Sequence, residues 1–588
     1  MPALGEYEWV YVLAGFAMVG ATFGIGANDG ANPWATPVGS KALSLRWAYA
    51  LAVVCEIAGA VGGGAPVAKT IRKGIADVEC FEGGRNDAAI LMYGNFSVLV
   101  VVGIWLVAAS VWEMPVSTTH TAVAGMVGMA WAAKGSGCVV WYEAGSPGQW
   151  EIPRGMAGIF LSWAFSPLLS GLISALLFAG VRRFILRSSN PFDRAVKFYP
   201  ILVFMAVTIM TFFMLAKGIS KKLCPKKTGD WLCSGGATRG EVAFGVALAV
   251  GATVAAAGVP LFRKVGQWAR EDTARKQWIR DEAAIAARPQ PVRVAVILED
   301  EEDSGDEPDA DPDALRRNSS YREATAPEPE ARAESPSEWC RRHVGAAWAN
   351  VRGRLSRWGT MDLHATALAS PVVADIHDNA EVFDPSAEAV FCYIQVFTAM
   401  ADSFAHGAND VANGVGAYMS VNHLYKTGEV ESKTDLDEND AYLILAGGGA
   451  GIALGLSIMG WRMIRVLGIK MCKVTPSRGF AIELGAALVL ILGSYKGMPL
   501  SSTHCQIGAT IGVALLDGKA GLNMHTVRIA AFGLIATLFA AGLSAAALTS
   551  QAIFAPSVGR LHDLSQDTCT GIGCDFNTTI AGTLGCVA

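Results

Sequence analysis

The sequence has few charged residues for its length, and this shortage excludes most soluble classes of protein. Only 17% of its 588 residues are Asp, Glu, Lys or Arg, whereas 52% are hydrophobic and 65 are glycine. A net charge of −5 gives no basic surface for nucleic acid, and no cysteine spacing is typical of a metal site. The apolar residues occur in runs long enough to cross a bilayer, so the composition predicts an all-α polytopic membrane protein surrounded by lipid.

About twelve apolar segments are long enough to be transmembrane helices. They cover residues 9–27, 46–66, 90–112, 116–133, 156–180, 198–217, 241–261, 389–407, 442–461, 478–495, 499–516 and 527–550. Seven segments precede a long polar stretch and five follow it. Because seven is odd, the two groups of segments enter the membrane from opposite sides, and we expect two inverted repeats.

These segments divide the chain into four parts. The parts are a first membrane half (1–261), a hydrophilic and largely disordered loop (262–387), a second membrane half (388–550) and a tail (551–588). Lys and Arg cluster at 182–197 and 263–280, which predicts a cytoplasmic loop and extracellular termini in a protein of the plasma membrane. Cys224 and Cys233 then lie outside, at a spacing suited to a disulfide. The acidic stretch 298–312 is interpreted as a solvated linker, with regulation as the alternative.

The motif Gly-Ala-Asn-Asp occurs twice, each time at the end of an apolar run. The two copies lie 381 positions apart (410 minus 29), and each is followed by Ala-Asn. Their polar residues are Asn28, Asp29 and Asn32 in the first copy and Asn409, Asp410 and Asn413 in the second. A carboxylate this deep in apolar sequence is costly and indicates a function. Duplicated carboxylates in inverted halves predict two half-sites that face each other near the middle of the membrane.

A second motif, a proline followed by hydroxyl residues and a histidine, is also duplicated. Its copies end at His120 and His504, an offset of 384 (504 minus 120) that is close to that of the first motif. Its hydroxyl residues are Ser117, Thr118, Thr119, Ser501, Ser502 and Thr503. A proline interrupts a helix, and the N–H groups at the start of the next helix, beside hydroxyl donors, form an anion site. The Asn-Asp pairs offer oxygen ligands of the kind that a hard cation such as sodium prefers.

The two paired motifs, together with Thr70–Ile75, resemble those of the inorganic phosphate transporter (PiT) family, and its fungal and algal sodium-dependent symporters most of all. The resemblance covers roughly 9–260 and 389–550. It implies phosphate binding by Asp29, Asn32, Ser117, Thr118, Thr119, Asp410, Asn413, Ser501, Ser502 and Thr503. It implies sodium binding or coupling by Asn28, Asp29, Asn409, Asp410, Glu56 and Glu483. The chain departs from the family pattern at Gly30, Pro33 and Ala417, which puts its affinity and stoichiometry in question but not its substrate class.

Glu56 and Glu483 are acidic residues within apolar segments. Glu56 lies in the first half of the chain and Glu483 in the second. Aligning the repeats places Gly449 opposite Glu56 and Leu99 opposite Glu483, so the two glutamates are not repeat partners. Both match glutamates that the family uses in phosphate transport. We interpret them as coupling or gating carboxylates, and a locally paired structural acid is the alternative.

The sequence therefore predicts a sodium-coupled phosphate symporter that works by alternating access, with sodium as the coupling ion and no other cofactor. A proton-coupled symporter and a phosphate sensor that does not transport remain alternatives. An intramembrane hydrolase that uses Ser117, His120 and Asp29 is disfavoured, because catalysis needs one asymmetric site and these residues are duplicated. We expect no enzyme activity, and a homodimer is compatible with the sequence.

Overall fold

The structure is a computed structural model, and it describes residues 3–83, 85–144, 153, 155–215, 239–286, 361–430, 438–495 and 500–554. In this part of the chain the regular elements are all helices. Residues up to Thr273 and from Met361 belong to one compact unit. By length and composition, eight of the described helical segments could cross a membrane, and a bent pair, Glu241–Ala257 with Val259–Gln277, could make a ninth. The prediction of an α-helical polytopic membrane protein is confirmed.

The helices of the first half follow the predicted apolar segments closely. They are α1 (Glu8–Asn28), η2 (Asp29–Ala31), α2 (Asn32–Gly39), α3 (Leu45–Lys73), α4 (Arg85–Val111), α5 (Thr118–Lys134), α6 (Gly155–Val181), α7 (Pro191–Met214), α9 (Arg239–Ala257) and α10 (Val259–Ala286). Two prolines, Pro33 and Pro37, lie in α2, where the chain continues from α1 beyond Asp29. The first Gly-Ala-Asn-Asp motif therefore ends where α1 gives way to η2 and α2.

The second half contains one very long helix, α14 (Pro385–Thr427), and a helical hairpin whose second arm, α18 (Ser502–Ala514), is shorter than the corresponding arm α5 of the first half. Its elements are α12 (Leu363–Leu368), α13 (Pro371–Asn379), α14 (Pro385–Thr427), α15 (Glu438–Met459), α16 (Trp461–Arg465), η8 (Val466–Lys470), α17 (Pro476–Tyr495), α18 (Ser502–Ala514) and α19 (Met524–Phe554). With 17 and 13 residues, α5 and α18 are shorter than the about 20 residues that a membrane-spanning helix needs. Each predicted segment overlaps a helix, but the segments in α5, α14 and α18 are not among the candidate spans, so the structure does not establish twelve crossings.

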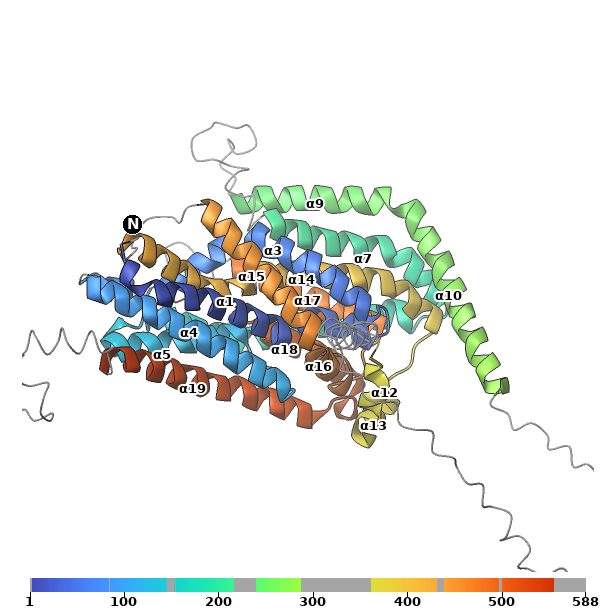
Figure 1. The fold of residues 1–588 in the computed structure, drawn as a ribbon. Helices are drawn as coiled ribbons and strands as arrows, with labels where there is room; N and C mark the ends of the chain where they lie inside the picture. Colours follow the sequence, from blue (N-terminus) through green and yellow to red (C-terminus); the bar gives the residue numbers. More distant parts are fainter. Residues whose placement is uncertain are drawn as a thin grey trace, which may run out of the picture. The chain divides into compact units, whose positions relative to one another are not determined.

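Two ends of the helix bundle can be defined by their contacts. At the first, called the disulfide end, Cys80 is bonded to Cys138 and the Leu4 N–H donates to the Tyr425 carbonyl at the end of α14. Since Leu4 precedes α1 and Tyr425 closes α14, these two helices run in opposite directions, as Figure 1 shows. The disulfide was missed by sequence analysis, and the predicted pair Cys224 and Cys233 lies outside the described residues.

At the opposite end, called the arginine end, basic side chains join several helices. Glu381 pairs with Arg182 at 2.5 Å and with Arg187 at 2.8 Å. Although partial burial opposes ionisation of Glu381, hydrogen bonds from the two arginines hold its pKa below the usual range. Arg465 and Lys470 both pair with Glu113, which follows α4. Loops from both halves of the chain are therefore held together by ion pairs at this end.

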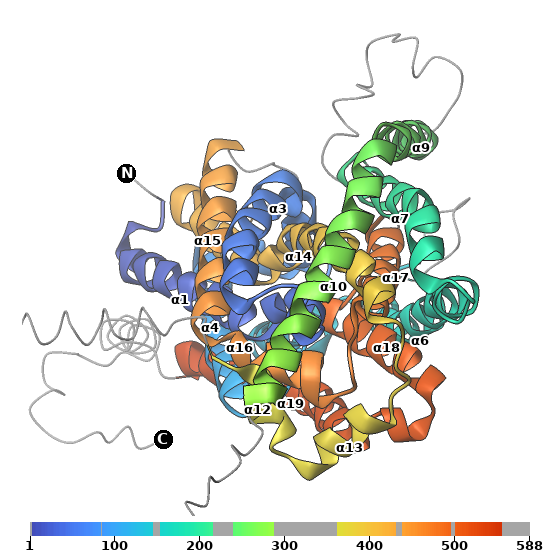
Figure 2. The same ribbon diagram turned by 90° about the vertical axis from the view of Figure 1, so that its right-hand side faces the viewer.

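The helical hairpins α4–α5 and α17–α18 enter the bundle from different ends. Lys134 pairs with Asp87 across the two arms of the first hairpin at the disulfide end, at 2.6 Å. Arg478 pairs with Asp517 across the arms of the second at the arginine end, at 2.7 Å. Figure 2, which looks along the bundle, shows α3 and α14 near its centre, with α1 and α15 on one side and α17 and α18 on the other.

Glycines in the two Gly-Ala-Asn-Asp motifs allow close helix crossings. A Cβ atom on Gly26 of α1 would lie 1.8 Å from the Ile452 carbonyl oxygen of α15. A Cβ atom on Gly407 of α14 would lie 2.4 Å from the Glu56 carbonyl oxygen of α3. No side chain fits at either crossing, so each glycine brings a motif helix against a neighbour by backbone contact.

The predicted loop 262–387 is helical at both of its ends. Helix α10 continues to Ala286, and α12 and α13 occupy 363–379. The His377 imidazole contacts the Ile469 carbonyl at 2.9 Å, and Lys473 donates to the His377 carbonyl at 3.0 Å. Residues 361–387 therefore pack on the membrane unit, and the predicted acidic linker lies outside the described residues.

Candidate functional site

The tips of the two hairpins meet inside the bundle. Ser117 caps α5 by accepting a hydrogen bond from the His120 N–H, and Ser501 caps α18 by accepting one from the His504 N–H. The Ser501 hydroxyl donates to the Ser117 hydroxyl oxygen at 2.8 Å. Both helices therefore begin at one point, where their positive dipole ends favour an anion. Pro115 precedes the first cap as predicted, whereas Pro499 lies outside the described residues.

Asp29 connects the two hairpins. Its carboxylate accepts from the Thr118 N–H at 2.9 Å and from the Thr503 hydroxyl at 2.6 Å. Asn32, on the next helical turn, donates to the same Thr503 hydroxyl oxygen at 3.3 Å. The Asn32 amide oxygen is buried and has no hydrogen-bond partner in the described part of the chain. The first motif therefore contacts the hydroxyl residues of both halves and leaves one oxygen free to accept.

Asp410 makes a similar set of contacts from the second half. It accepts from the Ser502 hydroxyl at 2.5 Å, from the Asn409 amide at 2.9 Å and from the Asn413 amide at 3.3 Å. Asn413 also donates across the bundle to the Thr118 hydroxyl oxygen at 3.0 Å and to that of Thr119 at 3.3 Å. The predicted phosphate-binding residues of both halves are thus brought into a single cluster.

Asn28, predicted to bind sodium, has a different immediate task in the structure. Its amide nitrogen donates to the Ser110 hydroxyl at 3.2 Å and to the Met114 carbonyl at 3.1 Å. Its amide oxygen accepts from the Val116 N–H at 3.1 Å. Because both ends of the amide are hydrogen-bonded to the first hairpin, Asn28 positions that hairpin.

Glu56 joins the cluster through a histidine that sequence analysis missed. Glu56 on α3 accepts from the Ser403 hydroxyl at 2.8 Å and contacts the His406 Nδ1 at 2.9 Å. The His406 Nε2 lies 3.1 Å from the Asp410 carboxylate. His406 therefore bridges a glutamate of the first half and an aspartate of the second, and its position four residues before Asp410 was the available sequence signal.

Glu483 is buried beside the cluster and does not contact Asp29 or Asp410. It accepts hydrogen bonds from the hydroxyls of Thr36 on α2 and Thr398 on α14. Neither threonine was selected from the sequence, because hydroxyl residues of this kind commonly bond to their own helix. The predicted coupling residues are therefore divided: Glu56 is connected to Asp410 through His406, whereas Glu483 contacts Thr36 and Thr398.

The two motif histidines lie behind the hairpin tips. The rings of His120 and His504 are 4.5 Å apart, and the His120 ring lies 3.6 Å from that of Trp163. The His504 Nδ1 contacts the Trp163 carbonyl at 3.0 Å. These contacts favour packing against α6 as their role.

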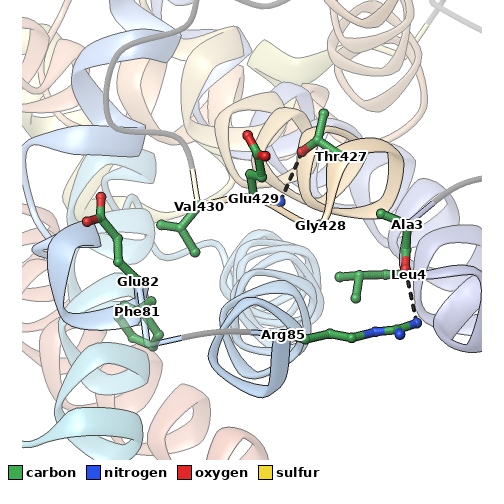
Figure 3. Close-up of a pocket in the computed structure, with 9 residues that line it drawn as sticks. All are labelled: Ala3, Leu4, Phe81, Glu82, Arg85, Thr427, Gly428, Glu429 and Val430. Atoms are coloured by element: carbon green, nitrogen blue, oxygen red, sulfur yellow. Dashed lines mark hydrogen bonds between the residues drawn. The ribbon is translucent and has the colours of Figure 1, made fainter.

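A pocket of about 560 Å³ lies elsewhere, at the disulfide end. Figure 3 shows its lining, in which the Arg85 guanidinium donates to the Ala3 carbonyl. It is lined by Ala3, Leu4, Phe81, Glu82, Arg85, Thr427, Gly428, Glu429 and Val430. None of the predicted site residues is among them, so this pocket is separate from the hairpin cluster.

The cluster is rich in oxygen atoms and poor in positive charge. Among the described residues, no lysine or arginine forms an ion pair with the four predicted carboxylates, and no group of three or more His, Cys, Asp or Glu side chains is placed to hold a metal ion. Any cation here would therefore rely on hydroxyl, amide and backbone oxygens together with carboxylates. That donor set suits sodium better than a transition metal.

Comparisons with known proteins agree with one another. The model of the phosphate transporter family matches residues 25–545. The chain is 30% identical to the phosphate-repressible phosphate permease of Neurospora crassa, over 95% of this chain and 99% of that protein. It is 27% identical to the sodium-dependent phosphate transporter 1 of Xenopus tropicalis, over 87% of this chain and 91% of that protein. A solved structure of a sodium-dependent phosphate transporter shares the fold, with a TM-score of 0.61 and 24% identity over 92% of this chain and 98% of that one.

Proposed function

This chain belongs to the phosphate transporter family, and from that premise we propose that it is a sodium-coupled symporter of inorganic phosphate. Phosphate transport follows from the family, and sodium is proposed because the relatives include sodium-dependent transporters. The proposal assigns the anion to the hairpin tips and the cations to the carboxylates beside them.

One observation carries the proposal: the donors that suit phosphate are hydrogen-bonded to two carboxylates. The Thr503 hydroxyl and the Thr118 N–H bond to Asp29, and the Ser502 hydroxyl bonds to Asp410. An anion can take these donors only when the carboxylates give them up. The two carboxylates would also repel a bound phosphate. For scale, two like charges about 4 Å apart repel by roughly 4 kcal/mol at an effective dielectric constant of 20. Cation binding at Asp29 and Asp410 removes both obstacles, so cations and phosphate must bind together.

The amide oxygens beside the carboxylates would complete the cation sites. The buried Asn32 oxygen lacks a partner in the described structure, and it belongs to a residue whose nitrogen already contacts Thr503. Asn409 donates through its nitrogen to Asp410, which leaves its oxygen for a cation. Asn413 and the hydroxyls of Ser117, Thr119 and Ser501 then form the remaining wall of the phosphate site.

We infer that the chain forms two inverted repeats that work by alternating access. This inference is supported by the opposite directions of α1 and α14, by hairpins that enter from opposite ends, and by the paired crossings at Gly26 and Gly407. Contacts that cross between the halves, such as Thr503 to Asp29, would then break and reform as one half moves against the other.

The proposed orientation places the disulfide end outside the cell and the arginine end in the cytoplasm of a plasma-membrane protein. The Cys80–Cys138 bond fits an oxidising compartment. Arg182 and Arg187 follow α6 at the other end, in agreement with the rule that cytoplasmic loops are basic.

A proton-coupled symporter is the second candidate, and His406 is the observation that favours it. Its imidazole bridges Glu56 and Asp410, and such a bridge can accept and release a proton between two acids. The ion that drives transport therefore has to be measured directly.

Phosphate uptake into proteoliposomes tests the proposal. Purified protein is reconstituted, and labelled phosphate uptake is measured with an inward sodium gradient, an inward proton gradient or no gradient. We expect concentrative uptake with the sodium gradient alone. Uptake driven only by protons would select the second candidate, and no uptake under any gradient would reject transport.

A further inference from the structure

Helix α14 carries a polar stripe that leads away from the phosphate cluster. Thr398, Asp402, His406 and Asp410 are spaced four residues apart, so their side chains lie along one face of the helix. Thr398 at one end donates to Glu483, and Asp410 at the other accepts from Ser502. The stripe thereby connects Glu483 with the hairpin cluster.

Asp402 is the unusual member of this stripe. Its side chain is buried, with 4% of the residue exposed, and its carboxylate has no hydrogen bond to any residue that the structure describes. The other buried acids of this region each accept at least two contacts, such as those of Ser403 and His406 to Glu56. A buried carboxylate without donors is costly unless a cation or proton neutralises it.

The surroundings of Asp402 supply negative charge and one imidazole. It interacts electrostatically with His406, Glu56 and Asp410, and also with Glu483 and the Cys505 thiol. Among these groups only His406 can carry positive charge, and that imidazole already contacts two acids. A single imidazole cannot balance Asp402 together with Glu56 and Asp410, so this region needs positive charge from outside the protein.

We propose that Asp402 is an additional binding residue for a coupling cation, and that it sets how many monovalent cations accompany each phosphate. The inference rests on the proposed function, because it concerns the coupling ratio of the same transport reaction. The cation lies between Glu483 and His406, beside the phosphate cluster and not within it. Sodium and the proton share the required chemistry, and the test separates them.

The test is the ratio of cations to phosphate in wild type and in Asp402→Asn. Reconstituted protein is held at a series of clamped membrane potentials, and the potential at which net phosphate flux stops is found for known gradients. One series uses a sodium gradient at equal pH, and the other uses a pH gradient at equal sodium. We expect Asp402→Asn to carry phosphate with about one positive charge fewer per phosphate than wild type. The series in which the ratio changes identifies the cation.

Two variants serve as controls. Asp402→Glu keeps the carboxylate and should keep the wild-type ratio. Asp193→Asn removes an exposed acid that pairs with Arg270 at 3.1 Å, far along the chain from the stripe, and should change nothing. An unchanged ratio in Asp402→Asn would overturn the inference, whereas a wild-type protein that moves no phosphate would reject the proposed function itself.

A second measurement applies if Asp402→Asn carries no phosphate. The Tm of the purified variant is followed as sodium is added and as pH is lowered. A cation that binds only the folded protein raises Tm. We expect a smaller rise in Asp402→Asn than in wild type for one of the two cations, and equal rises for both would contradict the proposal.

Discussion

The two motif-bearing helices, α1 and α14, contribute nearly the same residues to the hairpin cluster and very different residues along the rest of their length. Asp29 and Asp410 each bond to a hydroxyl of the second hairpin, and each has an asparagine three residues later. Subtracting the repeat offset of 381 from Thr398, Asp402 and His406 gives positions 17, 21 and 25. These positions hold Ala17, Ala21 and Ile25 in α1.

This difference separates two tasks that the duplicated motifs alone do not distinguish. Both halves contribute to the hairpin cluster to which we assign phosphate, since hydroxyls from Thr118 and Thr503 each contact an asparagine of the other half. The polar stripe occurs only on α14, and Glu56 reaches it from α3. In the proposed transport reaction, phosphate binding and the cation sites at Asp29 and Asp410 are therefore shared between the halves, whereas the additional cation site at Asp402 lies on α14 alone.

Adding a methyl group at the two close crossings should have the largest effect. Gly26→Ala and Gly407→Ala place a Cβ atom against a backbone carbonyl, and we expect each to cost about 4 to 5 kcal/mol or more of folding stability. Gly20→Ala is the control, since nothing lies within 4 Å of a Cβ atom there. Thermal unfolding of the purified proteins measures the effect. A wild-type Tm for either crossing variant would show that the two crossings are not equivalent.

The ion pairs that join the arms of each hairpin should differ in strength. Arg478 and Asp517 have side chains only 1% and 4% exposed, whereas those of Lys134 and Asp87 are 26% and 20% exposed. Removing one partner of a buried pair costs about 3 to 5 kcal/mol, and an exposed pair contributes about 1 kcal/mol or less. Asp517→Asn should therefore lower Tm far more than Asp87→Asn, and equal shifts would contradict this comparison.

Loss of the disulfide should destabilise one end of the molecule without changing transport. Cys80 and Cys138 are 58 residues apart in sequence, and removal of such a cross-link typically costs about 2 to 4 kcal/mol. We expect Cys80→Ser to lower Tm and to leave the KM for phosphate unchanged. Cys392→Ser is the matched control, because it changes a cysteine whose sulfur contacts the Glu388 carbonyl and is not part of the Cys80–Cys138 bond. A raised KM in Cys80→Ser would indicate that the disulfide end also shapes the phosphate site.

Removing the hydroxyl groups of the second hairpin should have the smallest effect on folding, but it should raise the KM for phosphate. Thr503→Val removes the donor to Asp29, and Ser502→Ala removes the donor to Asp410. In the proposed transport reaction the same hydroxyls donate to bound phosphate, a hydrogen bond to a charged group worth about 1.5 to 3 kcal/mol, so the KM for phosphate should rise by about tenfold or more in each variant. Uptake at varied phosphate concentration measures this. A rise in only one variant would break the equivalence of the two half-sites.

The sequence was sufficient to predict the helices and the motif residues that meet at the hairpin tips, because both depend on local patterns. Long apolar runs located the helices, and repeated Asn-Asp and hydroxyl motifs located the cluster around Asp29 and Asp410. Residues whose partners come from distant segments were missed, as with Thr36 and Thr398 at Glu483. The four-residue spacing from Thr398 to Asp410 was a readable signal, but only the fold shows that Glu56 and Glu483 meet it.

The role of Asn28 could not have been predicted from its motif. The motif places an amide beside a buried acid, which suits a cation ligand, but the same amide can hold a hairpin. Which occurs depends on where Ser110 and Val116 return along the chain. The Cys80–Cys138 bond was missed for the same reason, since only the packing of α4 against α5 brings these residues together.

The central claim is that Asp29 and Asp410 release phosphate donors only when cations bind them. Sodium-driven uptake of labelled phosphate by Asp29→Asn and Asp410→Asn, compared with wild type in matched proteoliposomes, tests it most directly. We predict that each single variant loses concentrative uptake although it folds and reconstitutes like wild type. Normal sodium-driven uptake by both variants would contradict the account.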